Sequence, residues 1–252
     1  MKPYRIVAPF LPLEPEAVHH QRLAAEAFDW PGAIAMLADS VKRTIGCPFH
    51  VITDVAADMT AAPTLRYSTR ERRLMLWNLE VAACYVESDD FDRDTVMVDS
   101  DQLIYGDLGQ WFRPRVDLGI LIRPKPMRIP ILNGVQFLAH RGKERLSAFY
   151  RKALEIARGL SDDEIRWGAD THALRMLLEP LTAGIHKRAG LTVSLMDHRP
   201  ILMPLTETQI AVLQQHGRFN QPAAPVLDFR YTRKRYLKAV YEASFAPVAV
   251  PA

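Results

Sequence analysis

The fold of this chain is decided by a short apolar run that ends in two carboxylates, Thr95-Val96-Met97-Val98-Asp99-Ser100-Asp101. The first four residues favour a buried strand. Side chains of an extended chain alternate between faces, so Asp99 and Asp101 point the same way, about 7 Å apart, and Ser100 points opposite. Open α/β folds place their ligand crevice at the carboxyl ends of strands. The run therefore predicts a charged site at a sheet edge, unless both acids are solvated turn residues.

The residue types at this position also limit the chemistry. Carboxylate oxygens suit Mg²⁺ or Mn²⁺ and suit soft metals poorly. Cys47 and Cys84 stand in apolar surroundings without metal-ligand spacing, which predicts free thiols in a reducing cytoplasm. The chain has neither a GxGxxG nor a GxxxxGK[ST] loop, so dehydrogenase and P-loop functions lose support.

Length and composition predict one ordinary globular domain. The chain has 252 residues, 48% of them hydrophobic, and a net charge of +3 that permits an anionic substrate. No apolar stretch approaches 18 residues and the first residues lack the apolar region of a secretory signal, so we expect a cytoplasmic protein without a transmembrane segment. We expect one domain over residues 1–245 and a loose tail over residues 246–252.

Strand patterns alternate with helix patterns along the chain. The predicted strands cover residues 4–10, 49–53, 65–67, 95–98, 118–122, 131–138, 191–196 and 226–229. The predicted helices cover residues 16–29, 34–45, 143–158 and 206–215, and two more follow capping boxes at 68–71 and 161–164. Asn133-Gly134 interrupts one strand and predicts a bulge. This alternation predicts an α/β fold with a mixed, mostly parallel central sheet flanked by helices.

Four segments then follow one another in a set order. They are residues 99–108, with the acid pair and a Gly-Asp-Leu turn; 133–137, Asn-Gly-Val-Gln-Phe; 167–170, Trp-Gly-Ala-Asp; and 227–229, Leu-Asp-Phe, leading to Lys234. Together they resemble the retaining GT-A glycosyltransferases of the glycogenin and lipopolysaccharide galactosyltransferase family, over roughly residues 4–240. The resemblance implies a GT-A fold and transfer of a hexose from a nucleotide diphosphate sugar, most often a UDP-sugar, with retention of configuration.

The resemblance also assigns roles around the acid pair. It implies that Asp101 binds a divalent metal, Mn²⁺ or Mg²⁺, that Asp99 binds the ribose and the metal, and that Ser100 lies at the donor. Both acids bound to the metal alone is an open alternative. A divalent ion held by carboxylates neutralises the diphosphate leaving group, which otherwise repels anionic neighbours.

The closing segment departs from the family pattern. Asp228 stands where the family has a histidine ligand, and Tyr231 stands where it has a glycine that approaches the phosphates, whereas Lys234 matches. We expect Asp228 as a third metal ligand, or else as a strand-end acid paired with Arg230. Lys234 and Arg233 are expected at the diphosphate, or else on a solvated helix face.

Two residues are the catalytic candidates, Asp170 and Gln136. By resemblance, the acid of the 167–170 segment faces the sugar near the anomeric carbon, although Thr171 replaces the glutamine that often follows. If the reaction inverts the configuration instead, Asp170 is the candidate base. The structural alternative for Asp170 is a buried salt bridge to Arg166 or Arg175.

Three further residues are expected to bind the donor. Asn133, like Gln136, is a candidate partner for sugar hydroxyls, since a polar pair is otherwise unhelpful in an apolar strand; a turn asparagine is its alternative. Arg73 matches an arginine near the donor in the family, or is a surface charge beside Arg70 and Arg72. Phe10 is placed against the uracil, with core packing as its alternative.

Acceptor and activity leave two competing hypotheses. The acceptor is expected to be a glycan, a lipid-linked group or another hydroxyl compound. The changed residues at 171, 228 and 231 also allow a non-catalytic protein that binds nucleotide sugars or glycans. The arginines at 66, 70, 72 and 73 and the basic run 230–238 allow a nucleic-acid acceptor.

Overall fold

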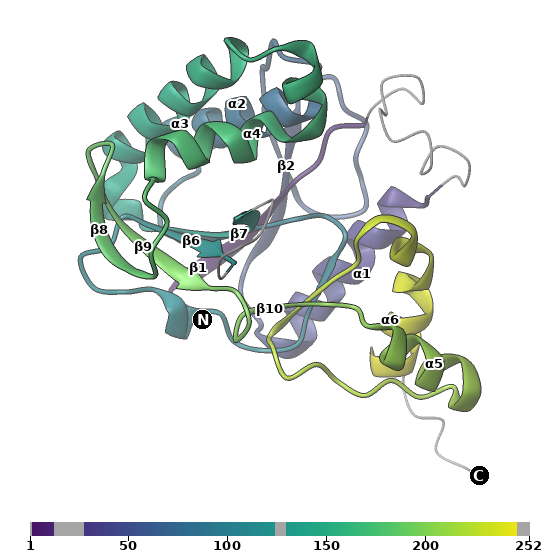
Figure 1. Ribbon diagram of the computed structural model, residues 1–252. Coiled ribbons are helices and arrows are strands. Elements are labelled where there is room, and N and C mark those ends of the chain that lie inside the picture. Colours follow the sequence, from purple (N-terminus) through teal and green to yellow (C-terminus); the bar gives the residue numbers. More distant parts are fainter. Residues whose placement is uncertain (1, 13–27, 124–129, 246–252) are drawn as a thin grey trace.

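The computed structural model describes residues 2–12, 28–123 and 130–245, apart from the side chains of Arg166, Trp167 and Tyr231 (Figure 1). The predicted helix over 16–29 and the tail 246–252 lie wholly or largely outside these ranges.

Within the described ranges, eight strands form the main sheet in the order β3-β2-β1-β4-β7-β6-β9-β8. Their bounds are Tyr4–Pro9 (β1), Phe49–Asp54 (β2), Thr64–Tyr67 (β3), Asp94–Val98 (β4), Leu118–Ile122 (β6), Ile131–Leu138 (β7), Gly184–Arg188 (β8) and Leu191–Asp197 (β9). The first four strands are mutually parallel, and β6 is parallel to β9, whereas β7 and β8 run antiparallel to their neighbours. The predicted mixed, mostly parallel sheet is confirmed.

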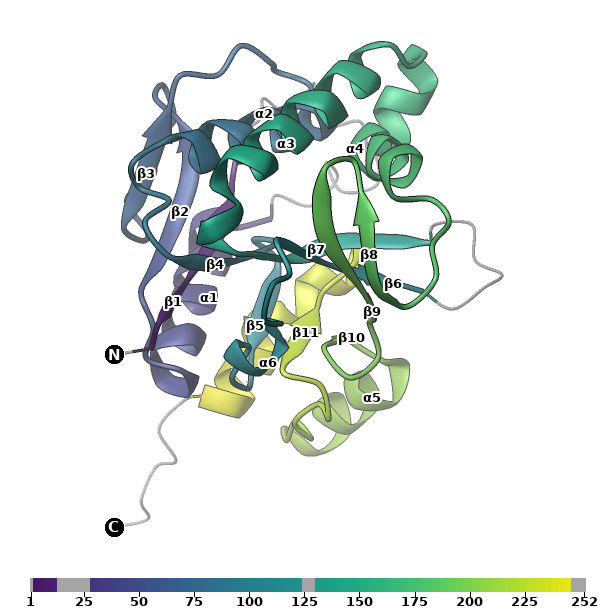
Figure 2. The ribbon, with the colours of Figure 1, turned by 90° about the vertical axis from the view of Figure 1, so that its left-hand side faces the viewer.

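A second, three-stranded sheet lies beside the main one (Figure 2). It joins β5 (Gln102–Ile104), directly after the acid pair, to β11 (Val226–Asp228) and β10 (Leu202–Pro204). Because β5 pairs antiparallel with β11, residues far apart in the sequence become neighbours. The small sheet therefore returns the last part of the chain to the end of β4.

Helices cover both faces of the main sheet (Figure 1). On one face lie α2 (Leu74–Glu87), α3 (Lys143–Arg158) and α4 (Asp162–Leu178). On the other lie α1 (Trp30–Thr44), the small sheet, α5 (Glu207–His216) and α6 (Leu237–Phe245). Short 3₁₀ turns cover Gly109–Trp111, His140–Gly142, which leads into α3, and Tyr231–Tyr236. The architecture is thus three-layered, with the sheet in the middle.

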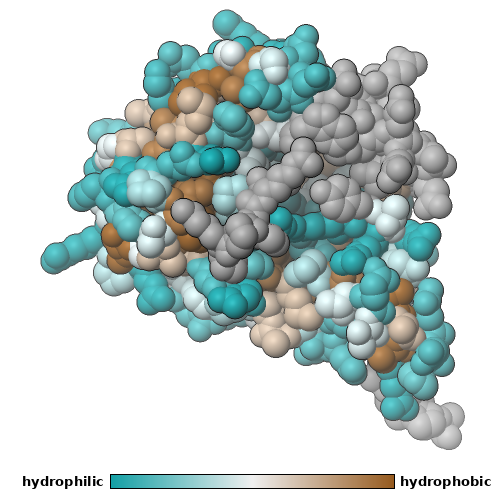
Figure 3. Space-filling view, viewed as in Figure 1, coloured by the Kyte–Doolittle hydropathy of each residue, from teal (hydrophilic) through white to brown (hydrophobic). Residues whose placement is uncertain are grey.

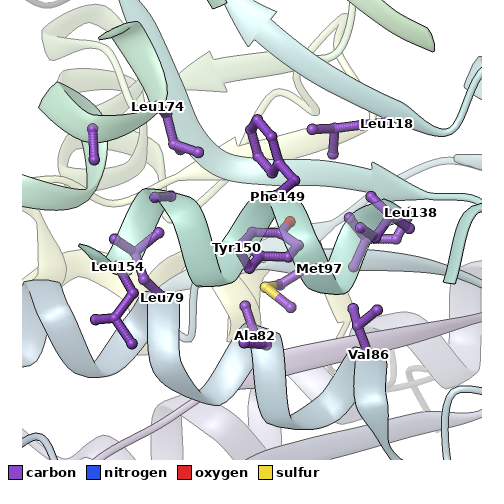
Figure 4. Close-up of a cluster of buried hydrophobic side chains, with 14 of the residues drawn as sticks. Leu79, Ala82, Val86, Met97, Leu118, Leu138, Phe149, Tyr150, Leu154 and Leu174 are labelled. Carbon is purple, nitrogen blue, oxygen red and sulfur yellow. The ribbon is translucent and has the colours of Figure 1, made fainter. Parts of the chain in front are cut away.

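The strands are apolar on both sides because both faces are covered. In β4, Met97 faces the α2–α3–α4 side, whereas Val96 and Val98 face the α1 side. Figure 4 shows Met97 packed between α2 and α3, close to the ring of Tyr150. Two cores therefore fix β4 from opposite sides and hold the residue that follows it, Asp99, in place.

Most predicted elements are present, with one wrong helix start. The capping box at 161–164 is confirmed, since Ser161 and Glu164 exchange side-chain-to-backbone contacts. The predicted box at 68–71 does not open α2, which begins later. Thr69 instead hydrogen-bonds to Asp54, and the carboxylate of Glu80 accepts two backbone N–H groups of the box. These long-range partners compete successfully with a local cap.

The predicted bulge in β7 is confirmed. Pairing with β6 shifts register so that Ile120 is opposite Gln136 while the next residue, Leu121, is opposite Leu132. The extra residues include Asn133 and Gly134, which stand at the same sheet edge as Asp99. A bulge re-aims side chains at such an edge.

The face of the molecule seen in Figure 3 is largely hydrophilic. Figure 3 shows hydrophilic residues over most of the described part of this face, with small hydrophobic groups between them. Among the described helices, none is both long enough and apolar enough to cross a bilayer. Cys47 and Cys84 are free thiols, Cys47 buried and Cys84 half-buried.

Candidate functional site

The acid pair lies at the carboxyl end of β4, as predicted from the sequence. The backbone N–H of Asp99 donates to the carbonyl of Gly134, 3.0 Å away, so the bulge of β7 continues the pairing past the end of β4. The carbonyl of Asp101 accepts from the N–H of Phe229 at 3.3 Å. Each acid is therefore tied to a different neighbouring segment.

A third carboxylate joins this pair from the distant small sheet. Asp228 ends β11 and is opposite Gln102 in the β5–β11 register. Because Gln102 follows Asp101 directly, this pairing sets Asp228 beside the acid pair. One oxygen each of Asp99, Asp101 and Asp228 lies within 4.8 Å of the other two.

Two cationic side chains face these three carboxylates. The Lys234 ammonium is 2.6 Å from Oδ2 of Asp101 and 4.3 Å from the ring centroid of Trp30. The guanidinium of Arg230 forms an ion pair with Asp228. The alternative expected for Asp228, pairing with Arg230, is thus present together with its placement beside Asp99 and Asp101.

The cluster carries an unfavourable excess of negative charge. The side chain of Asp99 is open to the cleft. Desolvation by the surrounding protein, followed by the charges of Asp101 and Asp228, nevertheless raises its pKa to about 8. Burial and the charge of Asp101 also raise the pKa of Asp228, although Arg230 opposes this effect. Carboxylates held together against their mutual repulsion indicate a place for an added cation.

Asp170 belongs to a second polar group, which lines the same cleft as the three carboxylates. It follows Gly168, whose φ of 131° breaks the regular helix of α4, and its side chain is only 3% exposed. Its carboxylate accepts from the side chain of Asn133 at 2.6 Å and from the N–H of Thr171 at 2.7 Å. Asn78 of α2 donates to it as well.

Burial raises the pKa of Asp170, and these hydrogen bonds only partly offset that effect. The described contacts of Arg175, the alternative partner expected for Asp170, include an ion pair with Glu179 at 2.5 Å. Asp170 is therefore held by neutral donors and leaves an acidic group facing the cleft.

These groups line one cleft of about 360 Å³ at the carboxyl end of β4, with walls from α1, α2, α4, β7 and the small sheet. The predicted site residues in its wall are Asp99, Ser100, Asp101, Asn133, Asp170, Asp228 and Lys234. The remaining wall includes Trp30 at the start of α1, Arg123 after β6, and apolar side chains such as Leu74 and Met75. A partly apolar cleft with a few convergent polar groups is typical of a small-molecule site.

Gln136 lies beneath this cleft rather than in its wall. It borders a small cavity of about 30 Å³ that Asp99 and Asp170 also line. Its Oε1 accepts from the hydroxyl of Tyr150 at 2.7 Å and its Nε2 donates to the carbonyl of Asn133 at 3.1 Å. Both ends of the side chain are thus engaged in holding the bulge.

Three other predicted residues lie outside the wall of the cleft. Phe10 is buried and packs beside Trp30, with ring centroids 6.0 Å apart. Arg73 is on the surface, where its guanidinium is 3.7 Å from Glu71 and 3.8 Å from Asp162. Arg233 donates to Glu207 at 2.9 Å and to a backbone carbonyl.

Three residues in the wall of the cleft were not predicted from the sequence as site residues: Asn78, Trp30 and Arg230. Asn78 is a polar residue within the apolar run of α2, which is a usable signal. Trp30 begins a helix and gives no such signal. The role of Arg230 depends on the fold of the small sheet.

The residues present fit a divalent cation. Three carboxylates converge, and the side chains of Arg230 and Lys234 pair with two of them. A Cβ placed on Gly134 would come within 2.4 Å of Oδ2 of Asp99, so only glycine leaves that carboxylate its position. An all-oxygen donor set of this kind suits Mg²⁺ or Mn²⁺.

Comparison with solved structures places this architecture among the GT-A glycosyltransferases, and the chain has that fold. A glycosyltransferase involved in glycosylation of the major capsid of PBCV-1 aligns with a TM-score of 0.56 and 9% identity, over 93% of this chain and 98% of that one. The galactosyltransferase LgtC, in complex with donor and acceptor sugar analogues, aligns with a TM-score of 0.51 and 11% identity, over 96% and 97%.

A third similar structure is longer than this chain. The apo form of the glycosyltransferase GlyE of Streptococcus pneumoniae TIGR4 aligns with a TM-score of 0.55 and 10% identity, over 94% of this chain and 60% of that one. No protein-family model and no curated protein matches the sequence. The similarity is therefore one of fold.

Proposed function

We propose that this protein is a metal-dependent glycosyltransferase that moves a hexose from a nucleotide diphosphate sugar, a UDP-sugar, to a hydroxyl group with retention of configuration. One observation carries the proposal. Three carboxylates and two cations meet in a single cleft at the carboxyl edge of a GT-A sheet. That edge is where open α/β folds bind their ligands.

Asp99, Asp101 and Asp228 would hold the divalent ion. When bound, this ion neutralises the diphosphate and stabilises the charge that grows on it as the sugar leaves. Lys234 and Arg230 now neutralise the same carboxylates. With the carboxylates holding a metal, Lys234 and Arg230 would be able to contact the phosphate oxygens instead.

The other side of the cleft suits the sugar. Asn133, Asn78 and Asp170 form a connected hydrogen-bonding group beside the acid cluster. In a retaining transfer the bond from the anomeric carbon to the diphosphate oxygen breaks and a bond to the acceptor oxygen forms on the same face. The departing diphosphate accepts the acceptor proton, so Asp170 acts by orienting the sugar and by its charge.

The solved structures support the same class of reaction. The LgtC complex holds donor and acceptor sugar analogues, and the PBCV-1 enzyme is involved in glycosylating a capsid protein. For this chain we propose a glycan, a lipid-linked group or another hydroxyl compound as the acceptor.

The test measures UDP release from UDP-galactose and UDP-glucose, with Mn²⁺, with Mg²⁺ and with a chelator. The proposal expects release that requires the metal and is lost in Asp101→Asn. The matched control is Asp58→Asn, an exposed acid away from the cleft, which should keep the wild-type rate. No release from any common nucleotide sugar under any of these conditions would count against the enzyme.

The same experiment separates the two competing hypotheses. Binding of UDP without turnover, retained in Asp101→Asn, favours a non-catalytic nucleotide-sugar protein. Against a nucleic-acid acceptor, several of the arginines that suggested it have partners inside the protein. Arg66 donates to backbone carbonyls, Arg72 pairs with Asp54, and Arg233 pairs with Glu207.

A further inference from the structure

A second cavity, of about 410 Å³, lies at the other end of the strands of the main sheet, away from the donor cleft. It is formed where β6 and β9 begin and where β7 and β8 end, whereas the donor cleft lies at the other ends of β6 and β7. Its wall consists of Arg115, Asp117, Arg141, Arg145, Lys187, Gly190 and Thr192. Four cationic side chains thus share one cavity with a single carboxylate.

That carboxylate is already neutralised. Asp117 is buried, and it accepts two hydrogen bonds from the guanidinium of Arg145, at 2.7 and 3.2 Å. It also accepts from the N–H of Thr192 at 2.9 Å. Arg145 and Asp117 together therefore contribute no net charge to the cavity.

The other three cations form no ion pair with any residue in the part of the chain that the structure describes. Arg141 donates to the neutral carbonyl of Val116 at 2.9 Å. Arg115 and Lys187 form no side-chain hydrogen bond or ion pair with any residue that the structure describes. All three side chains are exposed, so water screens much of their mutual repulsion, and an anion bound between them would neutralise the positive charge that remains.

The backbone of the cavity also leaves room for a ligand. A Cβ built on Gly190 meets no atom within 4 Å, so a ligand can approach the turn between β8 and β9 closely. Arg115 has a φ of 63°, a conformation that is strained for any residue with a Cβ. The chain keeps an arginine where glycine would fit better.

We infer that this cavity, defined by Arg115, Arg141 and Lys187 around the Asp117–Arg145 pair, is a second binding site that takes a phosphate-bearing anion. Two arginines and a lysine match the charge and the oxygen geometry of phosphate groups. The volume exceeds that of one phosphate and suits a diphosphate or a phospholipid headgroup. The site is independent of the proposed transferase activity.

The test titrates inorganic pyrophosphate into ¹⁵N-labelled protein at constant ionic strength with a chelator present. Amide signals of Gly190 and Thr192 report this cavity, and the amide of Gly134 reports the donor cleft separately. Saturable shifts at Gly190 and Thr192 support the site. Shifts at Gly134 alone, or no saturation at Gly190 and Thr192, overturn it.

The variant Arg115→Gly/Lys187→Gln removes two charges, and its glycine relieves the strained φ, so the fold should be retained. The expected result is a dissociation constant at least about tenfold higher at Gly190 and Thr192. The matched control, Lys42→Gln/Arg218→Gln, removes two exposed charges elsewhere and should leave binding unchanged. An equal loss in both variants means general charge attraction and overturns the proposal.

A vesicle arm identifies the source of the phosphate. The protein is sedimented with phosphatidylglycerol–phosphatidylcholine vesicles and with pure phosphatidylcholine vesicles. Sedimentation with the anionic vesicles alone, lost only in Arg115→Gly/Lys187→Gln, supports the site with a lipid headgroup as its ligand. Pyrophosphate binding without sedimentation supports the site with a soluble phosphate compound.

Discussion

The two ends of the strands in the main sheet carry opposite balances of charge; we call them the carboxyl edge and the amino edge. At the carboxyl edge, three carboxylates converge and two cations only partly offset them. At the amino edge, four cations surround one carboxylate. Desolvation by the surrounding protein raises the pKa of Asp99, whereas at Asp117 the hydrogen bonds from Arg145 and Thr192 outweigh burial and lower the pKa. An acid with satisfied partners stabilises the fold, and an acid held among acids is available for ligand chemistry.

The largest expected effect is on the rate of UDP release, when an acid at the carboxyl edge is removed. Asp101→Asn should lower the rate of UDP release by about 1,000-fold, or roughly 4 kcal/mol, because charge stabilisation of the leaving diphosphate is lost. Asp117→Ala, measured on folded protein, should keep turnover near wild type. The measurement is initial rate at saturating Mn²⁺, and equal losses in the two variants contradict the separation of roles.

The second effect concerns stability, which should depend on the acid at the amino edge. Asp117→Ala should lower the free energy of unfolding by roughly 3 kcal/mol, since a buried carboxylate with three hydrogen bonds is removed. Chemical denaturation measures this change. Asp58→Ala is the control and should remain within about 0.5 kcal/mol of wild type.

The third effect concerns pH. A metal must displace protons from carboxylates whose pKa is raised, so binding should weaken as pH falls. With one proton displaced, the dissociation constant for Mn²⁺ should rise about tenfold per pH unit below pH 8. Calorimetry between pH 6 and 7.5 checks this slope. A constant affinity over that range means that the carboxylates are already ionised.

The smallest effect concerns stability without metal. An acid whose pKa is higher in the folded state destabilises that state when the pH lies above its unfolded value, near 3.9. The destabilisation grows as pH rises toward about 8. Asp99→Asn should therefore stabilise the metal-free protein at pH 7.5, by only about 0.5 kcal/mol because solvent screens this partly exposed group, and should have no such effect at pH 3.5. Thermal unfolding in chelator measures both; destabilisation at pH 7.5 contradicts the prediction.

The elements of the fold that depend on local pattern were predicted from the sequence. The strand before Asp99, the apolar stripe of α1 and the bulge at Asn133 and Gly134 all follow from spacing and residue type. The helix start at 68–71 was wrong because Asp54 and Glu80, distant in sequence, use the groups that a local cap would need.

The residues of the cleft could be predicted where they directly follow a strand or belong to the ordered set of segments. Asp99 and Asp101 adjoin their strand, and the order of the other segments pointed to Asp170, Asp228 and Lys234. Gln136 and Arg73 were selected by type and order, but their side chains are engaged elsewhere.

The cavity at the amino edge gives no such signal in the sequence. Its charged residues come from four separate elements or turns, and no spacing connects them. Neighbouring β6 and β9 bring Asp117 beside Thr192, and the start of α3 adds Arg145. Only the completed sheet shows that these charges meet.

The return of the small sheet to the end of β4 also fixes when the acid cluster can arise during protein synthesis. Asp99 and Asp101 leave the ribosome early, but their third partner and the lysine that balances them follow more than a hundred residues later. A nascent chain therefore exposes only two of the three carboxylates, and its capture of stray divalent ions stays weak until β11 pairs with β5. The three-carboxylate cluster is therefore complete only after β11 has been synthesised and has paired with β5.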